Sequence, residues 1–303
     1  MMGRTILVVV DPNSNEDQPA IERAAWLAER VSADLELFGC DYDSEIDDRR
    51  VGTVWIPHPG AHEKLMLGHR QKLDALAAPL RKHGLKVTVD VAWDHPFGEA
   101  ILRKVQARKP WMVAKDTEYH SVLRRTVLSN TDWYLIRSCP APLLLVKARP
   151  IASKPKVFAA VDPLHQHDKP AQLDDSIFRF ADALARDTGG TLHVVHAYSA
   201  PMGLELPPDA AAAIAREHRD AMGSFLTSHV VPTRDTYLLE GPTHECLQQV
   251  AAEQGADFMV MGAVSRRGLN RLFIGSTAER VLDRLSCDLV ILKPAGFKPP
   301  ALD

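Results

Sequence analysis

Several features that mark common protein classes are missing from this sequence of 303 residues. No apolar run approaches the roughly 20 residues that a membrane-spanning helix needs, and the apolar stretch near the start is too short for a secretory signal. The four cysteines are scattered without a C-x-x-C pair, which argues against a disulfide framework or a zinc site. The formal net charge is only −3, so the sequence indicates no basic surface for nucleic acid or an anionic membrane. These absences favour a globular protein of the cytoplasm.

Signature motifs of several enzyme classes are missing as well. The chain contains no G-x-G-x-x-G dinucleotide fingerprint, no G-K-[ST] phosphate loop and no G-x-S-x-G nucleophile elbow. His62 begins the segment HEKLM, which lacks the second histidine of a zinc protease helix. His165 and His167 flank Gln166 in an expected loop, and without a third ligand they do not predict a metal site. The motifs therefore predict no catalytic centre.

Short apolar strands alternate with amphipathic segments along the first half of the chain. The run Thr5–Val10 is apolar throughout, which is typical of a parallel strand buried on both faces. Ala20–Val31 has helical spacing of its apolar residues, and Leu35–Cys40 predicts a second strand. Strands alternating with helices predict a doubly wound α/β sheet. The pattern continues with expected helices over Ala61–Lys82, Phe97–Ala107 and Thr126–Arg137 and expected strands over Lys86–Trp93, Trp111–Lys115 and Leu143–Lys147.

The second half of the chain repeats the first. KVFAAVDP at Lys156–Pro163 matches TILVVVDP at Thr5–Pro12, so that Asp162 corresponds to Asp11. An offset close to half the chain length indicates a duplicated domain and not a short-period solenoid. The segment Ala148–Pro155 has two prolines and no apolar periodicity, as expected of a linker. We predict two domains, residues 1–150 and 151–303.

A glycine-containing stretch near the end, residues 259–293, predicts an anion site. It reads as a strand ending at Gly262, a basic loop, Gly275 followed by hydroxyl residues at a helix start, and a final strand. Unpaired backbone N–H groups at a helix N-terminus favour an anion, and glycine lets the backbone approach it closely. The spacing resembles Gly-x2-Gly-x9-Gly-[Ser/Thr] of the universal stress protein family. Gly262, Gly275 and Ser276 are in place, and Ser265 stands where the family has its second glycine.

The resemblance extends over essentially the whole chain. The segments KDTEYHSVLRRTVLSNTDWYLIRSCPAPLLLVK and GSTAERVLDRLSCDLVILK are similar to the two halves of a tandem universal stress protein, most of all to the universal stress protein E subgroup. The resemblance implies two Rossmann-like, adenine nucleotide alpha hydrolase-like domains, each a five-stranded parallel sheet with helices on both faces. Single-domain members dimerise through the last strand. The resemblance therefore implies an internal pseudo-dimer in which PLLLVK and DLVILK lie adjacent, and a homodimer of the whole chain remains an alternative.

The resemblance also implies which residues hold a ligand. Asp162 is expected beside the base of a nucleotide, and the glycines with Ser276 are expected at its phosphates; in the alternative interpretation Asp162-Pro163 only ends a strand and turns the chain. A serine at position 265 costs about 1–2 kcal/mol if the backbone there is left-handed, which is roughly a tenfold loss of affinity. The full expected set is Asp162, Gly262, Ser265, Arg266, Gly275, Ser276 and Thr277.

The first half has lost the same pattern. Lys115 and Leu128 stand at the interval of Gly262 and Gly275, and a glutamate occupies the loop between them. A backbone cradle for phosphate cannot form in the same way with these side chains. Ser129 is retained, but a serine before a helix is more often an N-cap. We therefore expect ATP, if it binds, in the second domain only.

The sequence leaves three functions open. The resemblance implies a stress-response protein that binds and regulates, with a nucleotide or another anionic ligand as its partner. A slow ATPase is the second, although no base or metal carboxylate pair beyond Asp162 is evident. The third is a receptor for a non-nucleotide ligand, with an apolar cleft near Leu128. His196 is the other residue of interest, because the strand that contains it ends near the expected cleft.

Overall fold

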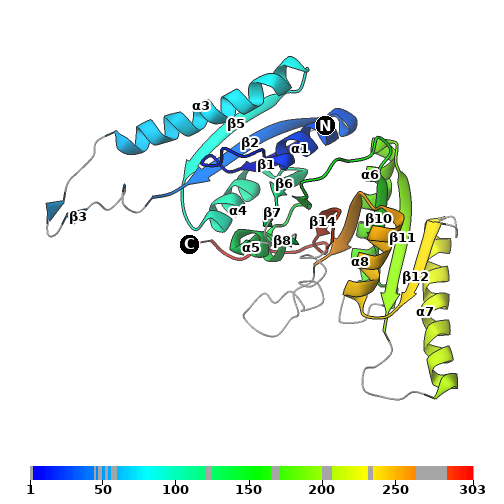
Figure 1. Cartoon of the computed structure of the whole chain (residues 1–303). Coiled ribbons are helices and arrows are strands. Elements are labelled where there is room, and N and C mark those ends of the chain that lie inside the picture. The colour runs from blue at the N-terminus through cyan, green and yellow to red at the C-terminus, as the bar shows by residue number, and fades with distance from the viewer. Residues whose placement is uncertain are drawn as a thin grey trace. The chain divides into compact units, whose positions relative to one another are not determined.

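The chain contains two compact units, Met1–Asp116 with Pro300–Asp303 and Thr117–Pro299. Each contains parallel strands with helices packed against them (Figure 1). We call residues 1–150 the first half and residues 151–303 the second half. The computed structural model describes residues 3–43, 46, 50–51, 54–55, 60–120, 125–127, 129–164, 171–199, 207–230, 235–263 and 285–302.

The first unit has a parallel sheet of four strands in the order β6-β1-β2-β5. Ile6, Leu7 and Val8 in β1 have no exposed surface, as the continuous apolar run predicts. The small antiparallel pair of β3 and β4 lies between β2 and α3 in the chain. The elements are β1 (Arg4–Val10), α1 (Pro19–Val31), β2 (Ala33–Asp41), β3 (Arg50–Val51), β4 (Val54–Trp55), α3 (Ala61–Lys82), β5 (Val87–Trp93), α4 (Phe97–Arg108) and β6 (Met112–Asp116).

The second unit contains the same arrangement with one strand more. Its five parallel strands follow the order β12-β11-β10-β13-β14. In both units the chain moves outward from the first strand and then returns to its other side, so right-handed crossovers place successive helices on opposite faces. The elements are β10 (Lys156–Ala160), α6 (Ala171–Thr188), β11 (Thr191–Tyr198), α7 (Pro208–His229), β12 (Thr236–Glu240), α8 (Thr243–Gln254), β13 (Phe258–Gly262) and β14 (Asp288–Leu292).

The last strand of the first half pairs with the last strand of the second half. β9 (Leu143–Val146) runs antiparallel to β14, with Leu145 opposite Leu289 and Leu143 opposite Ile291. Both strands are buried along their whole length, because each consists almost entirely of branched apolar residues. The expected adjacency of PLLLVK and DLVILK is therefore confirmed.

The helix expected over Thr126–Arg137 begins four residues later than predicted. Residues Glu118–His120 (β7) and Arg125–Val127 (β8) form an antiparallel pair, and α5 spans Asn130–Ser138. Ser129 and Asp132 form a capping box, in which each side chain accepts a hydrogen bond from the other's backbone N–H. The serine thus sets the true helix start, and its expected role as an N-cap is confirmed.

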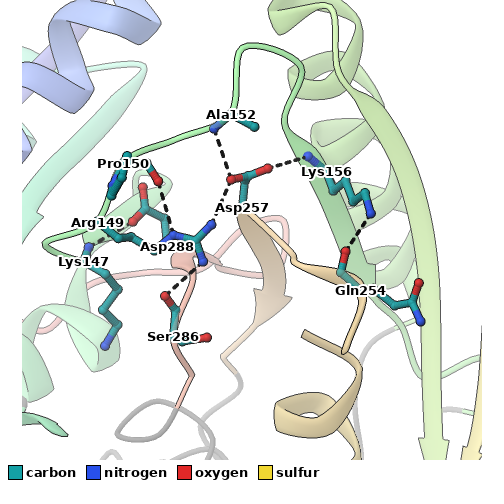
Figure 2. A network of polar contacts seen from close by, with 9 residues as sticks. All are labelled: Lys147, Arg149, Pro150, Ala152, Lys156, Gln254, Asp257, Ser286 and Asp288. Atoms are coloured by element: carbon teal, nitrogen blue, oxygen red, sulfur yellow. Dashed lines mark hydrogen bonds and ion pairs between the residues drawn. The ribbon is translucent and has the colours of Figure 1, made fainter. Parts of the chain in front are cut away.

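A buried carboxylate fastens the linker to the second half (Figure 2). Asp257 is 4% exposed and accepts hydrogen bonds from the Arg149 guanidinium at 2.9 Å, the Lys156 backbone N–H at 2.9 Å and the Ala152 backbone N–H at 3.3 Å. The adjacent Asp288 accepts from the backbone N–H of Lys147 at 2.9 Å. Residues of the linker are therefore held at the amino ends of β10 and β13.

Candidate functional site

Two predicted site residues come together at one edge of the second sheet. β10 and β13 are neighbours at the point where the strand order reverses, with Ala159 opposite Val260. Asp162 lies two residues beyond the end of β10, and Gly262 is the last residue of β13. Open α/β sheets bind ligands beyond the carboxyl ends of their strands at such a reversal.

Asp162 and Asp11 differ in their surroundings although they occupy equivalent positions. Asp11 is exposed, and its carboxylate accepts the backbone N–H of Asn13 at 2.8 Å, which is a local turn. Asp162 is partly buried, and its own N–H is bound by the carboxylate of Asp174 at 2.9 Å. The negative charge of Asp162 also acts on the imidazole of His218. The carboxylate of Asp11 therefore holds a local turn, whereas Asp162 is less exposed and its backbone is held by Asp174.

Gly262 is required by the packing of α6. A Cβ at this position would lie 2.6 Å from Leu173 Cδ2 and 3.0 Å from Leu173 Cγ, and Leu173 is fully buried. Contacts under 3.0 Å are not found for real Cβ atoms, so any larger residue must displace the helix side chain. The glycine thus has a structural reason that is independent of a phosphate.

The register of the sheets assigns Gly262 a different counterpart from the one that the sequence predicts. Ile6 in β1 and Val157 in β10 are equivalent positions of the repeat. Ile6 pairs with Met112 and Val157 pairs with Phe258, so Met112 and Phe258 are equivalent as well. Counting along the strands equates Gly262 with Asp116, not with Lys115. The expected correspondence of Lys115 and Gly262 is therefore wrong by one residue, although the loss of the glycine from the first half is confirmed.

Asp116 places a carboxylate at a helix N-terminus in the first half. Its Oδ1 accepts the backbone N–H of Ala20, in the first turn of α1, at 2.6 Å. Helix N-termini attract anions because their first N–H groups are unpaired and the helix dipole is positive there. In the first half, the protein's own carboxylate occupies this position. The Lys115 ammonium, at the neighbouring position, donates to the Asp116 carbonyl at 3.0 Å.

The remaining members of the expected phosphate site lie outside the described residues. These are Ser265, Arg266, Gly275, Ser276 and Thr277, and Leu128 in the first half is outside them too. Ser276 is followed three residues later by Glu279, which repeats the serine and acidic spacing of the capping box at Ser129. His165 and His167 are also outside the described part of the chain.

A buried histidine pair lies at the carboxyl end of β11. His196 Nε2 and His218 Nδ1 are 2.8 Å apart, and each residue is only 2% exposed. The ring of Tyr198 stacks on that of His218 with centroids 4.4 Å apart, and the Tyr198 hydroxyl donates to Glu240 at 3.5 Å. Burial lowers the pKa of His218 and, together with Glu240, raises that of Tyr198. The sequence analysis singled out His196 as a residue near the expected cleft, but it did not identify His218 or Tyr198.

The first half has a histidine in the corresponding place with another partner. His69 Nε2 lies 2.7 Å from Asp41 Oδ2, and both residues are buried. His69, Leu73 and Ala77 form the buried stripe of α3 at four-residue spacing. The buried residues His218, Met222 and Leu226 repeat this stripe on α7. That spacing is the sequence signal from which His218 could have been found.

Two of the four cysteines, Cys139 and Cys287, are deeply buried. All four are free thiols, and burial raises the pKa of Cys139 to about 11 and that of Cys287 to about 12. Thiols react as thiolates, so these two are inert at neutral pH. Within the described ranges, no group of three His, Cys, Asp or Glu side chains is placed to hold a metal ion. The helices of the described chain include none that is long and apolar enough to cross a membrane.

A further titratable group that sequence reasoning missed follows β14. Burial lowers the pKa of Lys293 to about 8, and its ammonium donates to the carbonyl of Ala263 at 3.4 Å. Ala263 directly follows Gly262, so this lysine lies at the same carboxyl edge as the expected anion site. Its counterpart in the first half is Lys147. The N–H of Ala263 donates to the carbonyl of Leu292, directly before Lys293, and the N–H of Thr117 donates to the carbonyl of Val146, directly before Lys147.

The model of the universal stress protein family matches the chain twice, over residues 2–147 and 167–293. The chain belongs to the universal stress protein family. The two matches end at Lys147 and Lys293, the equivalent residues that follow β9 and β14. The tandem organisation of a universal stress protein chain thus agrees with the internal repeat and with the fold.

Similar proteins extend over the whole chain. Universal stress protein E of Salmonella typhi is 29% identical over 311 residues, covering 99% of this chain and 97% of the relative. Universal stress protein E homolog of Haemophilus influenzae is 26% identical, covering 97% and 99%. The crystal structure of a putative universal stress protein from Pseudomonas aeruginosa UCBPP-PA14 is 29% identical, with a TM-score of 0.76 over 97% of this chain and 94% of that one. A universal stress protein from Archaeoglobus fulgidus, 15% identical with a TM-score of 0.66, shares the fold.

Proposed function

We propose that this universal stress protein regulates by binding, and that its second half holds ATP or a related anionic ligand. One observation carries the proposal. Asp162 and Gly262 end neighbouring strands at the reversal of strand order in the second sheet, where open α/β sheets bind nucleotides. The partly buried carboxylate of Asp162 would accept hydrogen bonds from the amino group of a base.

The phosphate end of the site is proposed on the segment after Gly262. Backbone N–H groups around Ser265 and Gly275 would donate to phosphate oxygens, with Ser276 and Thr277 adding hydroxyl donors. Arg266 would neutralise part of the charge. Lys293 supports the proposal, because it brings a cation to the carbonyl of Ala263 at the start of this segment.

We propose that the first half binds no ATP. The position of Gly262 is taken by Asp116, whose carboxylate accepts the first-turn N–H of Ala20. A phosphate near that position would face the negative charge of this carboxylate. The carboxylate of Asp11 accepts the backbone N–H of Asn13, which is a local contact.

The two halves, residues 1–150 and 151–303, are proposed as two domains paired as an internal pseudo-dimer. The antiparallel contact of β9 with β14 supports this arrangement. We further propose a cytoplasmic location, which the four free cysteines support because thiols persist in a reducing compartment.

Calorimetric titration of the full chain with Mg-ATP tests the proposal. We expect one site per chain, a loss of affinity of about tenfold or more in Asp162→Ala, and no change in the matched variant Asp11→Ala. The absence of binding in the wild type, or two sites per chain, would contradict it. Release of inorganic phosphate that disappears in Asp162→Ala would instead favour a slow ATPase.

A further inference from the structure

A lysine at the carboxyl edge of the second sheet carries a charge that the described part of the chain does not balance. Lys293 directly follows β14, whose last residue, Leu292, lies opposite Gly262 at the end of β13. The Lys293 ammonium donates to the carbonyl oxygen of Ala263 at 3.4 Å. The cation is therefore placed at the residue that directly follows Gly262, on the edge where open α/β sheets bind ligands.

A tight turn covers this ammonium with an aromatic ring. The N–H of Phe297 donates to the carbonyl of Pro294 at 3.1 Å, and Gly296 supplies the positive φ of 75° that the turn requires. The turn brings the centre of the Phe297 ring to 4.9 Å from Lys293 Nζ. The face of the ring attracts a cation, but the ring carries no net charge. Over the described residues, the ammonium thus has one long hydrogen bond and one ring as its contacts.

The contacts of Lys104 in the first half show what Lys293 lacks. The ammonium of Lys104 lies 2.6 Å from a carboxylate oxygen of Glu36 and 2.6 Å from one of Asp90. In the described chain, no carboxylate forms an ion pair with Lys293, and a charge removed from water is stabilised by an anion beside it.

The titratable group that faces Lys293 supplies no charge at neutral pH. This group is the thiol of Cys139, at the end of α5. Burial raises the pKa of Cys139 to about 11, so the thiol is protonated and uncharged. Burial therefore lowers the pKa of Lys293 to about 8 with little opposition.

We propose that Lys293 binds a phosphate oxyanion at the ends of β13 and β14, and that this anion supplies the missing negative charge. A lysine ammonium binds phosphate as a compact point charge with three N–H donors, of which the described chain uses one, toward Ala263. The anion is a phosphate of a bound nucleotide, in which case the proposal rests on the proposed function, or a polyphosphate without a base. The two sources offer the same chemistry to the lysine.

Binding of the anion and protonation of Lys293 are linked. The anion binds the charged form of the lysine, so its binding raises the pKa of Lys293 above the value of about 8 in the free protein. By the same linkage, affinity is highest below that pH and falls as the pH rises through it. Because the charged fraction decreases about tenfold between pH 7 and pH 9 for this pKa, affinity should decrease by about the same factor.

NMR titration of the full chain tests the proposal. In protein labelled with 13C at the lysine Cε, the signal of Lys293, assigned by its loss in Lys293→Arg, should titrate near pH 8 without ligand. Excess tripolyphosphate or Mg-ATP should move the midpoint up by about one pH unit or more, and adenosine should not move it. A shift with Mg-ATP alone identifies a nucleotide phosphate, and a shift with tripolyphosphate shows that no base is needed. No shift with either anion, or an equal shift with adenosine, would overturn the proposal.

Two substitutions assign the affinity to this lysine. Lys293→Met keeps an apolar stem and removes the charge. By calorimetry, its affinity at pH 7 for the anion that moves the NMR signal should be about tenfold lower, and the difference between pH 7 and pH 9 should disappear. Lys298→Met removes an exposed charge nearby in the chain and should bind as the wild type does. Equal losses in the two variants would reduce the effect to net charge and refute the proposal.

Two outcomes distinguish the anion site from the proposed ATP site. If Mg-ATP binds to the wild type and to Lys293→Met with the same affinity, Lys293 is not a binding residue, and the ATP site stands without it. If Mg-ATP does not bind but tripolyphosphate raises the pKa of Lys293, the ATP site fails and the anion site stands.

Discussion

At the ends of their second strands, the first half of the chain pairs a histidine with a carboxylate and the second half pairs it with another histidine. His69 contacts Asp41 at 2.7 Å, and His218 contacts His196 at 2.8 Å. A related difference is found at two positions that the strand register makes equivalent. Where the first half has Glu36 between the cations of Lys104 and Arg108, the second has His193 stacked on an aromatic ring.

The comparison shows that the two halves share the same backbone arrangement and differ in the charged side chains at equivalent positions. The register of β1 with β2 and of β10 with β11 is the same, so each position of one sheet has a counterpart in the other. At the reversal of strand order, the first half has the carboxylate of Asp116 where the second has Gly262. One sheet has a charge of its own at this carboxyl edge, and the other is uncharged at that position.

The largest effect is expected at the amino ends of the strands, where Asp257 corresponds to Trp111. Asp257→Ala removes a buried acceptor from Arg149 and two backbone N–H groups, and leaving such donors unpaired should cost about 3 kcal/mol of unfolding free energy. Trp111→Phe should cost less than about 1 kcal/mol, because the contact with Arg4 is a partly exposed cation–π pair. Urea unfolding followed by circular dichroism measures both, and equal losses would contradict the assigned roles.

The next largest effect is a difference in unfolding free energy between substitutions at the equivalent residues Gly262 and Asp116. Gly262→Ala drives a Cβ into Leu173, and overpacking of this kind should lower the unfolding free energy by about 1–3 kcal/mol. Asp116→Ala removes one acceptor for the first turn of α1 and should cost about 1 kcal/mol. Urea midpoints of the two variants decide the order. A harmless Gly262→Ala would show that the glycine is needed only for a ligand.

A smaller, pH-dependent effect is expected at His193. Burial lowers its pKa, with Asp235 acting in the opposite sense, so the unfolded chain binds the proton more readily than the folded one. The contribution of this residue to stability is therefore complete above about pH 6.5 and decreases as the pH falls through that value toward the folded pKa. The unfolding midpoint should fall between pH 7.5 and pH 5.5, and less so in His193→Gln.

Glu36→Gln is the matched change in the first half. It removes contacts of 2.6 Å with Lys104 and 2.8 Å with Arg108, so it should lower the midpoint at both pH values. If His193→Gln has the full wild-type pH dependence, the acid response arises elsewhere.

The smallest effect on stability, and a clear chemical one, is expected at the two lysines after the last strands. The pKa of about 8 means that Lys293 has more neutral amine at pH 8 than an ordinary lysine. As the pH is raised, Lys293 should begin to react with trinitrobenzenesulfonate at a lower pH than ordinary lysines, and its rate should be half-maximal near pH 8. Lys147 is 4% exposed and should be protected. Peptide mapping of the labelled protein measures both, and faster labelling of Lys147 would contradict the prediction.

Patterns within short segments predicted most of the fold. The apolar run of β1, the helical spacing of α1 and the bounds of α3 were predicted to within a residue or two, because local periodicity reports which face of an element is buried. The start of α5 was missed, since Thr126 and Val127 fit a strand as well as a helix. Ser129 nevertheless had the role that its place before a helix predicts.

The candidate site was predicted less completely, because its contacts join residues far apart in the chain. Asp162 and Gly262 were found from the repeat and the glycine spacing. Asp116 was missed because the one-residue shift between the halves is visible only in the strand register. His218 was missed because its partner lies 22 residues away on another element.

The sequence by itself determined that this protein is a duplicated α/β chain of the universal stress protein family and that the two halves differ at the glycine motif. Only the tertiary structure decided which groups face one another: β9 beside β14, Asp116 at the start of α1, and His196 against His218. The physical reason is that hydrophobic periodicity specifies burial one element at a time. Hydrogen-bond partners are fixed only when the elements pack and each buried polar group must find a donor or an acceptor.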